Sequence, residues 1–453
     1  MAKDFDYTEE ERQRNRVLEY QRRLLNGIKF DSPELEKCIS DTEETLKALG
    51  KEYDIIRVNK KAKAYNQEQR PAAITLPTWE QLSSEANNNV KDDISLKDFF
   101  TNEELEINRR FIEQLNEDFN AIHHLDTIDW TISAVAGIVS AAVDILFVGI
   151  PGPSETGVKA GSLSNYIREY FEKKYPPEEM EELGRKKFVK TPYDAQDNRH
   201  TTEYIEGLSA YYHRLLSLGH DPLLGFFIGV LDIMRGTMTT IDKKGKVVTQ
   251  VIDIYSDRKE ASLFEALTKQ LLHLKSDLTT SMGLPVPLMG LFNLMQFGSI
   301  GEEKQTVAEI VQGMYYEGYD FIHFCSMSIP VMLTEVIVRV SWCIKRMKEG
   351  HCLKESLPFS TNRERKPKLA TMLFIAHSAA TAINAGKFAF TENPMAINYP
   401  QWLAFGKYAF SQLKWSLYQK PELRDKYVMG KIEDERLSIL EEINKNYEQF
   451  FRL

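Results

Sequence analysis

The chain has 453 residues, of which 43% are hydrophobic and 27% charged, proportions typical of a folded globular protein with a sizeable core. Its net charge of −9 argues against nucleic acid as the main partner. Four scattered cysteines without a C-x-x-C pair, and a polar N-terminus without a secretory signal, predict a cytoplasmic protein with no disulfide framework.

The first region, residues 1–120, is strongly polar and mostly helical in pattern. Apolar residues recur at three- and four-residue spacing within dense charge over 9–29 and 32–53, which predicts two helices. Residues 64–96 are rich in Asn, Gln and Pro and are interpreted as a linker, and a further helix is expected over 98–120. We interpret this region as a helical arm for an adaptor or oligomerisation role.

A second region, residues 121–300, opens with an apolar run from Ile132 to Ile150 that is just long enough to cross a bilayer. Ser133, Gly137 and Ala141 recur there at four-residue spacing, which would let another helix approach closely in water or in lipid. The run lacks flanking Lys or Arg and an aromatic belt on both sides. A buried core helix is therefore favoured, with peripheral membrane contact as the alternative.

The remainder of this region alternates between helical and extended patterns. We expect helices over 202–218, 223–235 and 262–278. Alternating residues over about 237–254, with Gly245 at the centre, predict a small β-hairpin.

The third region, residues 301–453, is helical in pattern throughout. The expected fold is mainly α, a multi-helix bundle with one small β-hairpin. The helices predicted in this region are 303–318, 328–348, 366–386, 400–418 and 432–452.

The segment 262–278 carries the residue pair most typical of a functional site. On a helix, His273 and Asp277 are one turn apart and point the same way, so both can reach one divalent metal. A mixed imidazole and carboxylate set suits Zn, Mn or Fe. The alternative is an ordinary hydrogen bond between the two side chains on a helix surface.

Upstream, a second group of candidate ligands lies close together in sequence. His213 and His220 each offer an imidazole, although His213 could belong to an amphipathic helix and His220 could cap a helix C-terminus. Asp221 could act as a catalytic base or cap the next helix. Asp144 is a candidate ligand or base because a carboxylate inside an apolar helix is costly unless it is paired, hydrogen-bonded or bound to metal.

These residues carry a resemblance to a known family. The block from His213-Arg214 to Ser217-Leu-Gly-His220, followed by His273-x-x-x-Asp277-x-x-Thr280-x-x-Gly283-x-Pro285, resembles the bacterial LexA-regulated membrane-bound metal-dependent hydrolases over roughly residues 130–290. The family's P-D-x-D-H motif is missing, and Asp144 stands about where it should be. The resemblance implies an all-α metallohydrolase core acting on a phosphoester or lipid-like substrate at a membrane. The whole chain is also similar to uncharacterised proteins of bacterial mobile elements.

Two functions from different classes follow. The first is a metal-dependent hydrolase, and the second is a non-enzymatic helical interaction or membrane-associated protein of a mobile element or phage-conflict system. No phosphate-binding loop, dinucleotide fingerprint or nucleophile elbow is present in the sequence. The candidate metal ligands are His213, His220, His273, Asp277 and Asp144, with Asp221 or Asp144 as the candidate catalytic base.

Overall fold

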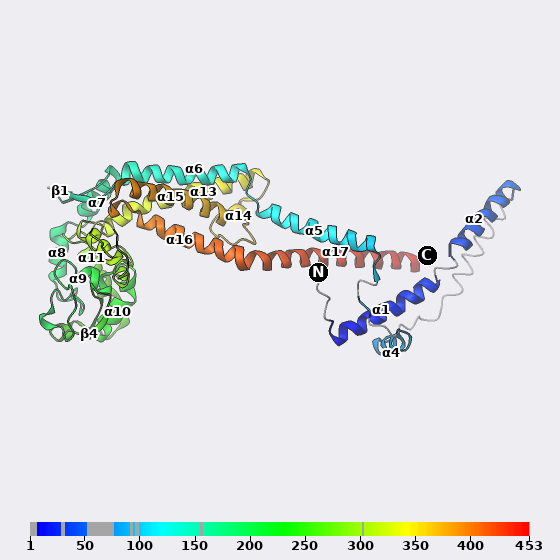
Figure 1. Ribbon diagram of the computed structural model, residues 1–453, viewed down its shortest axis with the longest axis horizontal. Helices are drawn as coiled ribbons and strands as arrows, with labels where there is room; N and C mark the ends of the chain where they lie inside the picture. Colours follow the sequence, from blue (N-terminus) through cyan, green and yellow to red (C-terminus); the bar gives the residue numbers. More distant parts are fainter. Residues whose placement is uncertain are drawn as a thin grey trace. The chain divides into compact units, whose positions relative to one another are not determined.

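The computed structural model confirms a mainly α fold, in which two small antiparallel sheets are the only ones among the described residues (Figure 1). The chain divides into two compact units, Met1–Glu117 and Asp118–Leu453. The residues described are 7–28, 32–51, 77–90, 94–95, 99–154, 157–300 and 303–452.

The first unit contains the helices α1 (Glu9–Ile28), α2 (Ser32–Ala48) and α4 (Trp79–Asn89), and α5 (Asn102–His123) begins in it. The α4 helix corrects the prediction of a linker over 64–96. Thr78 and Gln81 form a reciprocal capping box that satisfies two orphan donors and starts this helix. Residues 64–76, 91–93 and 96 of the predicted linker lie outside the described residues.

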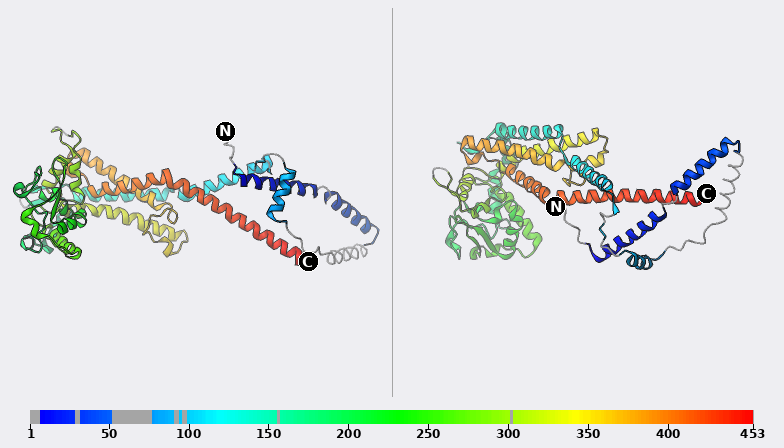
Figure 2. Two further views of the ribbon diagram at one scale, coloured as in Figure 1. Left: turned by 90° about the horizontal axis from the view of Figure 1, so that it is seen from below. Right: turned by 45° about the vertical axis from the view of Figure 1, so that its right-hand side comes forward.

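The core of the second unit is a bundle of long helices: α6 (Thr127–Val143), α13 (Phe321–Lys348), α15 (Leu369–Thr391) and α16 (Tyr399–Lys414) (Figures 1 and 2). A π-helical turn, η2 (Asp144–Val148), extends α6.

Ion pairs and hydrogen bonds fix the direction of these helices. Lys345 of α13 pairs with Asp129 near the start of α6, and the Ser140 hydroxyl further along α6 donates to the Pro330 carbonyl. The two helices are therefore antiparallel. Lys368, just before α15, pairs with Asp129, whereas Lys387 near the end of α15 pairs with Asp144. Thus α15 runs parallel to α6.

Gly137 shows why small residues are spaced along α6. A Cβ placed on Gly137 would lie 2.5 Å from the Ala376 carbonyl oxygen and 2.8 Å from the Ala379 Cβ. The backbones of α6 and α15 therefore approach closely only because this position has no side chain. The expectation that the small-residue stripe accepts a neighbouring helix is confirmed.

Three helices among the described residues are long and apolar enough to cross a membrane, judged by length and composition: Asn102–Val148, Phe321–Lys348 and Leu369–Thr391. Much of their apolar surface is open. Leu146 of η2 is 69% exposed, and Met332, Val336 and Val340 form an exposed stripe at four-residue spacing along α13. Apolar side chains of these helices therefore lie both in the bundle core, such as Val338 and Met372, and on the outer surface.

Residues 149–320 form a lobe inserted between α6 and α13. The predicted hairpin is confirmed, and Gly245 occupies its turn with a φ of 81°. The predicted helix 262–278 is confirmed as α11. The elements of the lobe are β1 (Gly152–Ser154), β2 (Gly157–Lys159), α7 (Ser162–Lys174), α8 (Pro177–Arg185), α9 (His213–Leu216), α10 (Ile228–Arg235), β3 (Thr237–Ile241), β4 (Val247–Val251), α11 (Leu263–Asp277) and α12 (Val307–Tyr316).

The predicted helix 202–218 is wrong, since only α9 is α-helical there. The side chain of Asn198 donates to the Ile205 carbonyl and accepts from its N–H, and Gly207 has a φ of 77°. Such side-chain bonds to the backbone compete with helix formation. The result is an irregular segment that leads into α9.

The lobe and the bundle share one hydrophobic cluster. Val148 at the end of η2, Leu215 of α9, Met289 of the lobe and Met327 of α13 are all buried in it. The short helix α14 (Leu353–Ser356) lies between α13 and α15. After α16, the π turn η9 (Trp415–Gln419) leads into the long helix α17 (Lys420–Arg452), which is mostly exposed over the residues 420–446.

Candidate metal centre

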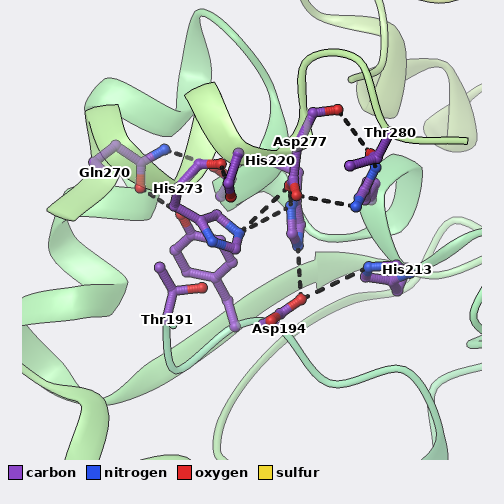
Figure 3. Close-up of polar contacts among 12 residues, drawn as sticks. Thr191, Asp194, His213, His220, Gln270, His273, Asp277 and Thr280 are labelled. Atoms are coloured by element: carbon purple, nitrogen blue, oxygen red, sulfur yellow. Dashed lines mark hydrogen bonds and ion pairs between the residues drawn. The ribbon is translucent and has the colours of Figure 1, made fainter. Parts of the chain in front are cut away.

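Three segments of the lobe bring the candidate ligands together (Figure 3). Helix α11 directs Gln270, His273 and Asp277 to its buried face, as expected for residues three, four and seven apart. The α9 turn and the 3-10 turn after it supply His213 and His220, both buried. A loop before α9 adds a carboxylate, Asp194.

Asp194 faces two imidazole nitrogens that have no hydrogen-bond partner. Its Oδ1 lies 3.7 Å from His213 Nε2 and 4.0 Å from His220 Nε2, too far for a hydrogen bond. These three residues form a group whose ligand atoms all lie within 4.8 Å of one another. The site therefore presents three ligand atoms to a common point.

Hydrogen bonds at the opposite ring nitrogens determine which nitrogen carries the proton. His213 Nδ1 lies 2.8 Å from the Ala210 carbonyl oxygen, and His220 Nδ1 lies 3.0 Å from Asp277 Oδ2. A carbonyl and a carboxylate both require a donor, so each Nδ1 carries the hydrogen. Both Nε2 atoms consequently present lone pairs toward Asp194, as metal-ligating histidines do when their other nitrogen is held by an acceptor.

Asp277 is the centre of a second, adjoining network. Its carboxylate accepts from His220, pairs with Arg214 at 3.0 Å, and lies 3.6 Å from His273 Nε2. The Arg214 guanidinium also donates to the Thr280 hydroxyl at 2.6 Å. His220, His273 and Asp277 satisfy the distance criterion for a ligand group as well. However, Asp277 is already neutralised by Arg214, so we interpret this network as the support that orients His220.

Burial controls the protonation of these groups. Desolvation lowers the pKa of His213 to about 4 and that of His220 to about 4, so both imidazoles are neutral at pH 7. Asp277 is desolvated too, but Arg214 and the neighbouring imidazoles outweigh the burial and hold its pKa well below the usual range. Neutral imidazoles beside an ionised carboxylate are the protonation states that metal binding requires.

The walls of the site depend on a tyrosine and a glycine. The Tyr193 ring meets the rings of His220 and His273 edge-on, with centroids 5.1 and 5.4 Å apart. A Cβ on Gly219 would lie 2.7 Å from the Tyr193 ring, so glycine is required there. Gln270 accepts from the Tyr193 hydroxyl and donates to the Gly219 carbonyl, which holds both in place.

Four predicted ligands, His213, His220, His273 and Asp277, lie together in the structure. Asp194 joins them and was missed by the sequence reasoning. It sits in a loop with no periodicity, and no spacing relates it to the histidines. Its only signal is its place directly after Thr-Pro-Tyr193, a turn-forming stretch within an otherwise charged segment.

Asp144, predicted as a ligand or base, lies elsewhere. Its carboxylate accepts from the side chains of Asn384 and Asn398 and pairs with Lys387 at 3.0 Å, inside the helix bundle. Its burial is explained by this network, because a buried carboxylate is tolerated once paired and hydrogen-bonded. The assignment of Asp144 to the metal set does not fit this geometry.

Asp221, predicted as the base, serves as an anchor. Its Oδ1 accepts the backbone N–H groups of Leu223 and Leu224, and its Oδ2 accepts that of Leu288 at 2.6 Å. The capping alternative is the one that fits, and a catalytic role does not. Burial nevertheless raises the pKa of this carboxyl.

Comparison of the chain with family models, with curated proteins and with solved structures yields no match.

Proposed function

We propose that this protein is a membrane-associated, divalent-metal-dependent hydrolase. Asp194, His213 and His220 hold the cation in this proposal, and His273, Asp277 and Arg214 orient the ligands. Two nitrogen ligands and one oxygen ligand are the protein donors of many catalytic zinc sites, and Mn or Fe would accept the same donors. The resemblance to metal-dependent hydrolases noted above points to the same chemistry.

The observation that carries the proposal is that three hydrogen-bond acceptors, two imidazole nitrogens and one carboxylate oxygen, lie close together with no donor between them. Lone pairs on His213 Nε2 and His220 Nε2 face the Asp194 carboxylate, and an arrangement of acceptors alone is unfavourable unless a cation lies among them. A purely structural cluster would place a proton there. Desolvation instead keeps both imidazoles neutral.

A bound divalent cation would supply a Lewis acid that polarises a phosphoryl or acyl oxygen and lowers the pKa of water. The chain's own residues define the approach. The Asp194 side chain is 24% exposed, whereas those of His213 and His220 are nearly fully buried. Solvent and substrate therefore reach the site from the Asp194 side.

Membrane association rests on the exterior of the bundle. The apolar faces of α6 and α13 are exposed over lengths that match a hydrocarbon core, and charged groups such as Asp144 and Lys387 are turned inward. Contiguous apolar surface of this kind marks membrane or protein contact. A lipid-like phosphoester fits both the metal chemistry and this location.

Metal analysis of the purified full-length protein tests the proposal. We expect about one equivalent of divalent metal in the wild type and loss of at least 90% of it in Asp194→Asn and His213→Ala. His200→Ala removes an exposed histidine of the same lobe and is the matched control. His273→Ala should weaken metal affinity by ~10–100-fold without abolishing it, because it perturbs a supporting residue. Wild-type protein that binds no added Zn, Mn or Fe would contradict the proposal and favour the non-enzymatic helical alternative.

A further inference from the structure

A second feature of the unit Asp118–Leu453 is an apolar cavity of about 320 Å³ where the lobe meets the bundle. Small-molecule sites typically start near this volume. One wall is a face of α12, formed by Val307, Ile310, Val311 and Met314. The end of α15 and the segment that follows it, including Phe388, also line the cavity.

The lining exposes only apolar surface to the cavity. The hydroxyl of the lining residue Tyr319 donates to the Ile397 carbonyl and accepts from the Tyr399 N–H at 3.1 Å. An occupant would therefore meet only carbon and sulfur atoms. This excludes ligands that need a hydrogen bond, such as sugars or nucleotides, and favours a hydrocarbon chain.

The position of the cavity identifies the source of such a chain. Phe388 lies on α15, one of the three helices apolar enough to cross a bilayer, and Phe390 two residues later is 91% exposed. Phe297, close in sequence to the lining residue Ile300, is 65% exposed. Ile300 lines the cavity and is itself 45% exposed, so the apolar lining reaches the surface of the protein.

One segment connects the cavity with the candidate metal centre. Gly283 accepts a hydrogen bond from Arg214 at 3.2 Å, and Leu288 donates to Asp221, the neighbour of His220. Between and beside these anchors, Val286 and Met289 line the cavity. The wall of the cavity is therefore held by residues adjacent to two members of the site.

We propose that this cavity binds one hydrocarbon chain of a membrane lipid. Binding of the lipid chain does not depend on the proposed hydrolase function. Only the role of this lipid as the substrate rests on that function.

Photo-crosslinking in membranes tests the inference. Full-length protein in vesicles of phosphatidylglycerol and phosphatidylethanolamine, doped with a lipid carrying a diazirine near the end of one acyl chain, is irradiated and digested. Peptide mass spectrometry then locates the crosslinks. We expect crosslinks on 307–316 and 388–399, in addition to those on the exposed face of α13 from lipids that merely surround the bundle.

The variant Val311→Trp fills the cavity, and we expect it to reduce the 307–316 and 388–399 crosslinks at least tenfold. The α13 crosslinks should remain and act as an internal control. Leu263→Trp adds the same bulk at an exposed position of the lobe and should change neither set. If Val311→Trp does not fold, Ile310→Phe replaces it as the test variant. Its smaller added volume fills the cavity only in part, so the crosslinks on 307–316 and 388–399 should decrease in part.

Two outcomes overturn the inference: crosslinks confined to the outer bundle surface, or cavity crosslinks that persist in both filled variants. Metal content measured on the same samples separates this result from the proposed function. Loss of cavity crosslinks in Val311→Trp with metal retained supports the binding site alone. Metal-free wild type with cavity crosslinks intact would contradict the hydrolase while leaving the lipid site standing.

Discussion

Acidification should destabilise the metal-free protein through its buried imidazoles. Burial lowers the pKa of His213 to about 4, whereas an unfolded histidine titrates near 6.5. Between these values the unfolded chain binds more protons than the folded chain. The contribution of His213 to the free energy of unfolding is therefore fully present above pH 6.5 and is lost as the pH decreases toward 4. The difference corresponds to about 3 kcal/mol for this one imidazole once the pH is below 4.

The variant His213→Asn isolates this contribution. An asparagine can still donate to the Ala210 carbonyl that His213 Nδ1 now contacts, but it does not titrate in this range. At pH 7 we expect the variant to be less stable than the wild type because of lost packing. As the pH falls from 6.5 to 4, the free energy of unfolding of the wild type minus that of the variant should decrease by about 3 kcal/mol.

Guanidinium unfolding followed by tryptophan fluorescence, in a chelator and at half-unit pH steps, measures this difference directly. Carboxylates that protonate in the same range do so in both proteins and cancel. His200→Asn, at an exposed position of the lobe, should reproduce the wild-type profile. A wild-type-minus-variant difference that stays constant from pH 7 to pH 4 would refute the assignment of a neutral, buried imidazole at position 213.

Three further outcomes are expected. Adding Zn²⁺ at 100 times its dissociation constant should stabilise the chelated wild type by about 2.7 kcal/mol in thermal unfolding and leave Asp194→Asn unchanged. Lys387→Met should lower stability by about 3–5 kcal/mol because it leaves the buried Asp144 carboxylate uncompensated, and adding Asp144→Asn should restore most of the loss. Gly137→Leu should force α6 away from Ala376 and cost at least about 1–3 kcal/mol, seen as a lowered melting temperature, whereas the exposed Val139→Leu should not.

Much of the fold could be predicted from periodicity. The spacing of apolar residues located α11 and the long bundle helices, and the alternation around Gly245 located the hairpin. Prediction failed where local side-chain bonds replaced the periodic pattern. Asn198 organises the irregular segment before α9, and the Thr78 capping box starts α4 inside a stretch whose composition resembles a linker.

The candidate site could be predicted from the sequence only where its residues are spaced one turn apart on the same helix. His273 and Asp277 share one face of α11, so their proximity follows from the sequence alone. Asp194 reaches His213 through a loop, and no local rule fixes its position. Asp144 was assigned to the wrong surroundings because its partners, Asn384, Lys387 and Asn398, lie more than two hundred residues further along the chain.

The insertion of the lobe between antiparallel helices has an architectural consequence. Because α6 ends near the start of α13, both chain connections of the lobe emerge at the same end of the helical pair. The pairing of α6 and α13 thus does not depend on the length of the chain between them, and closing a longer loop costs only slightly more entropy. A scaffold of this kind can acquire, enlarge or exchange its inserted lobe while its own topology is preserved.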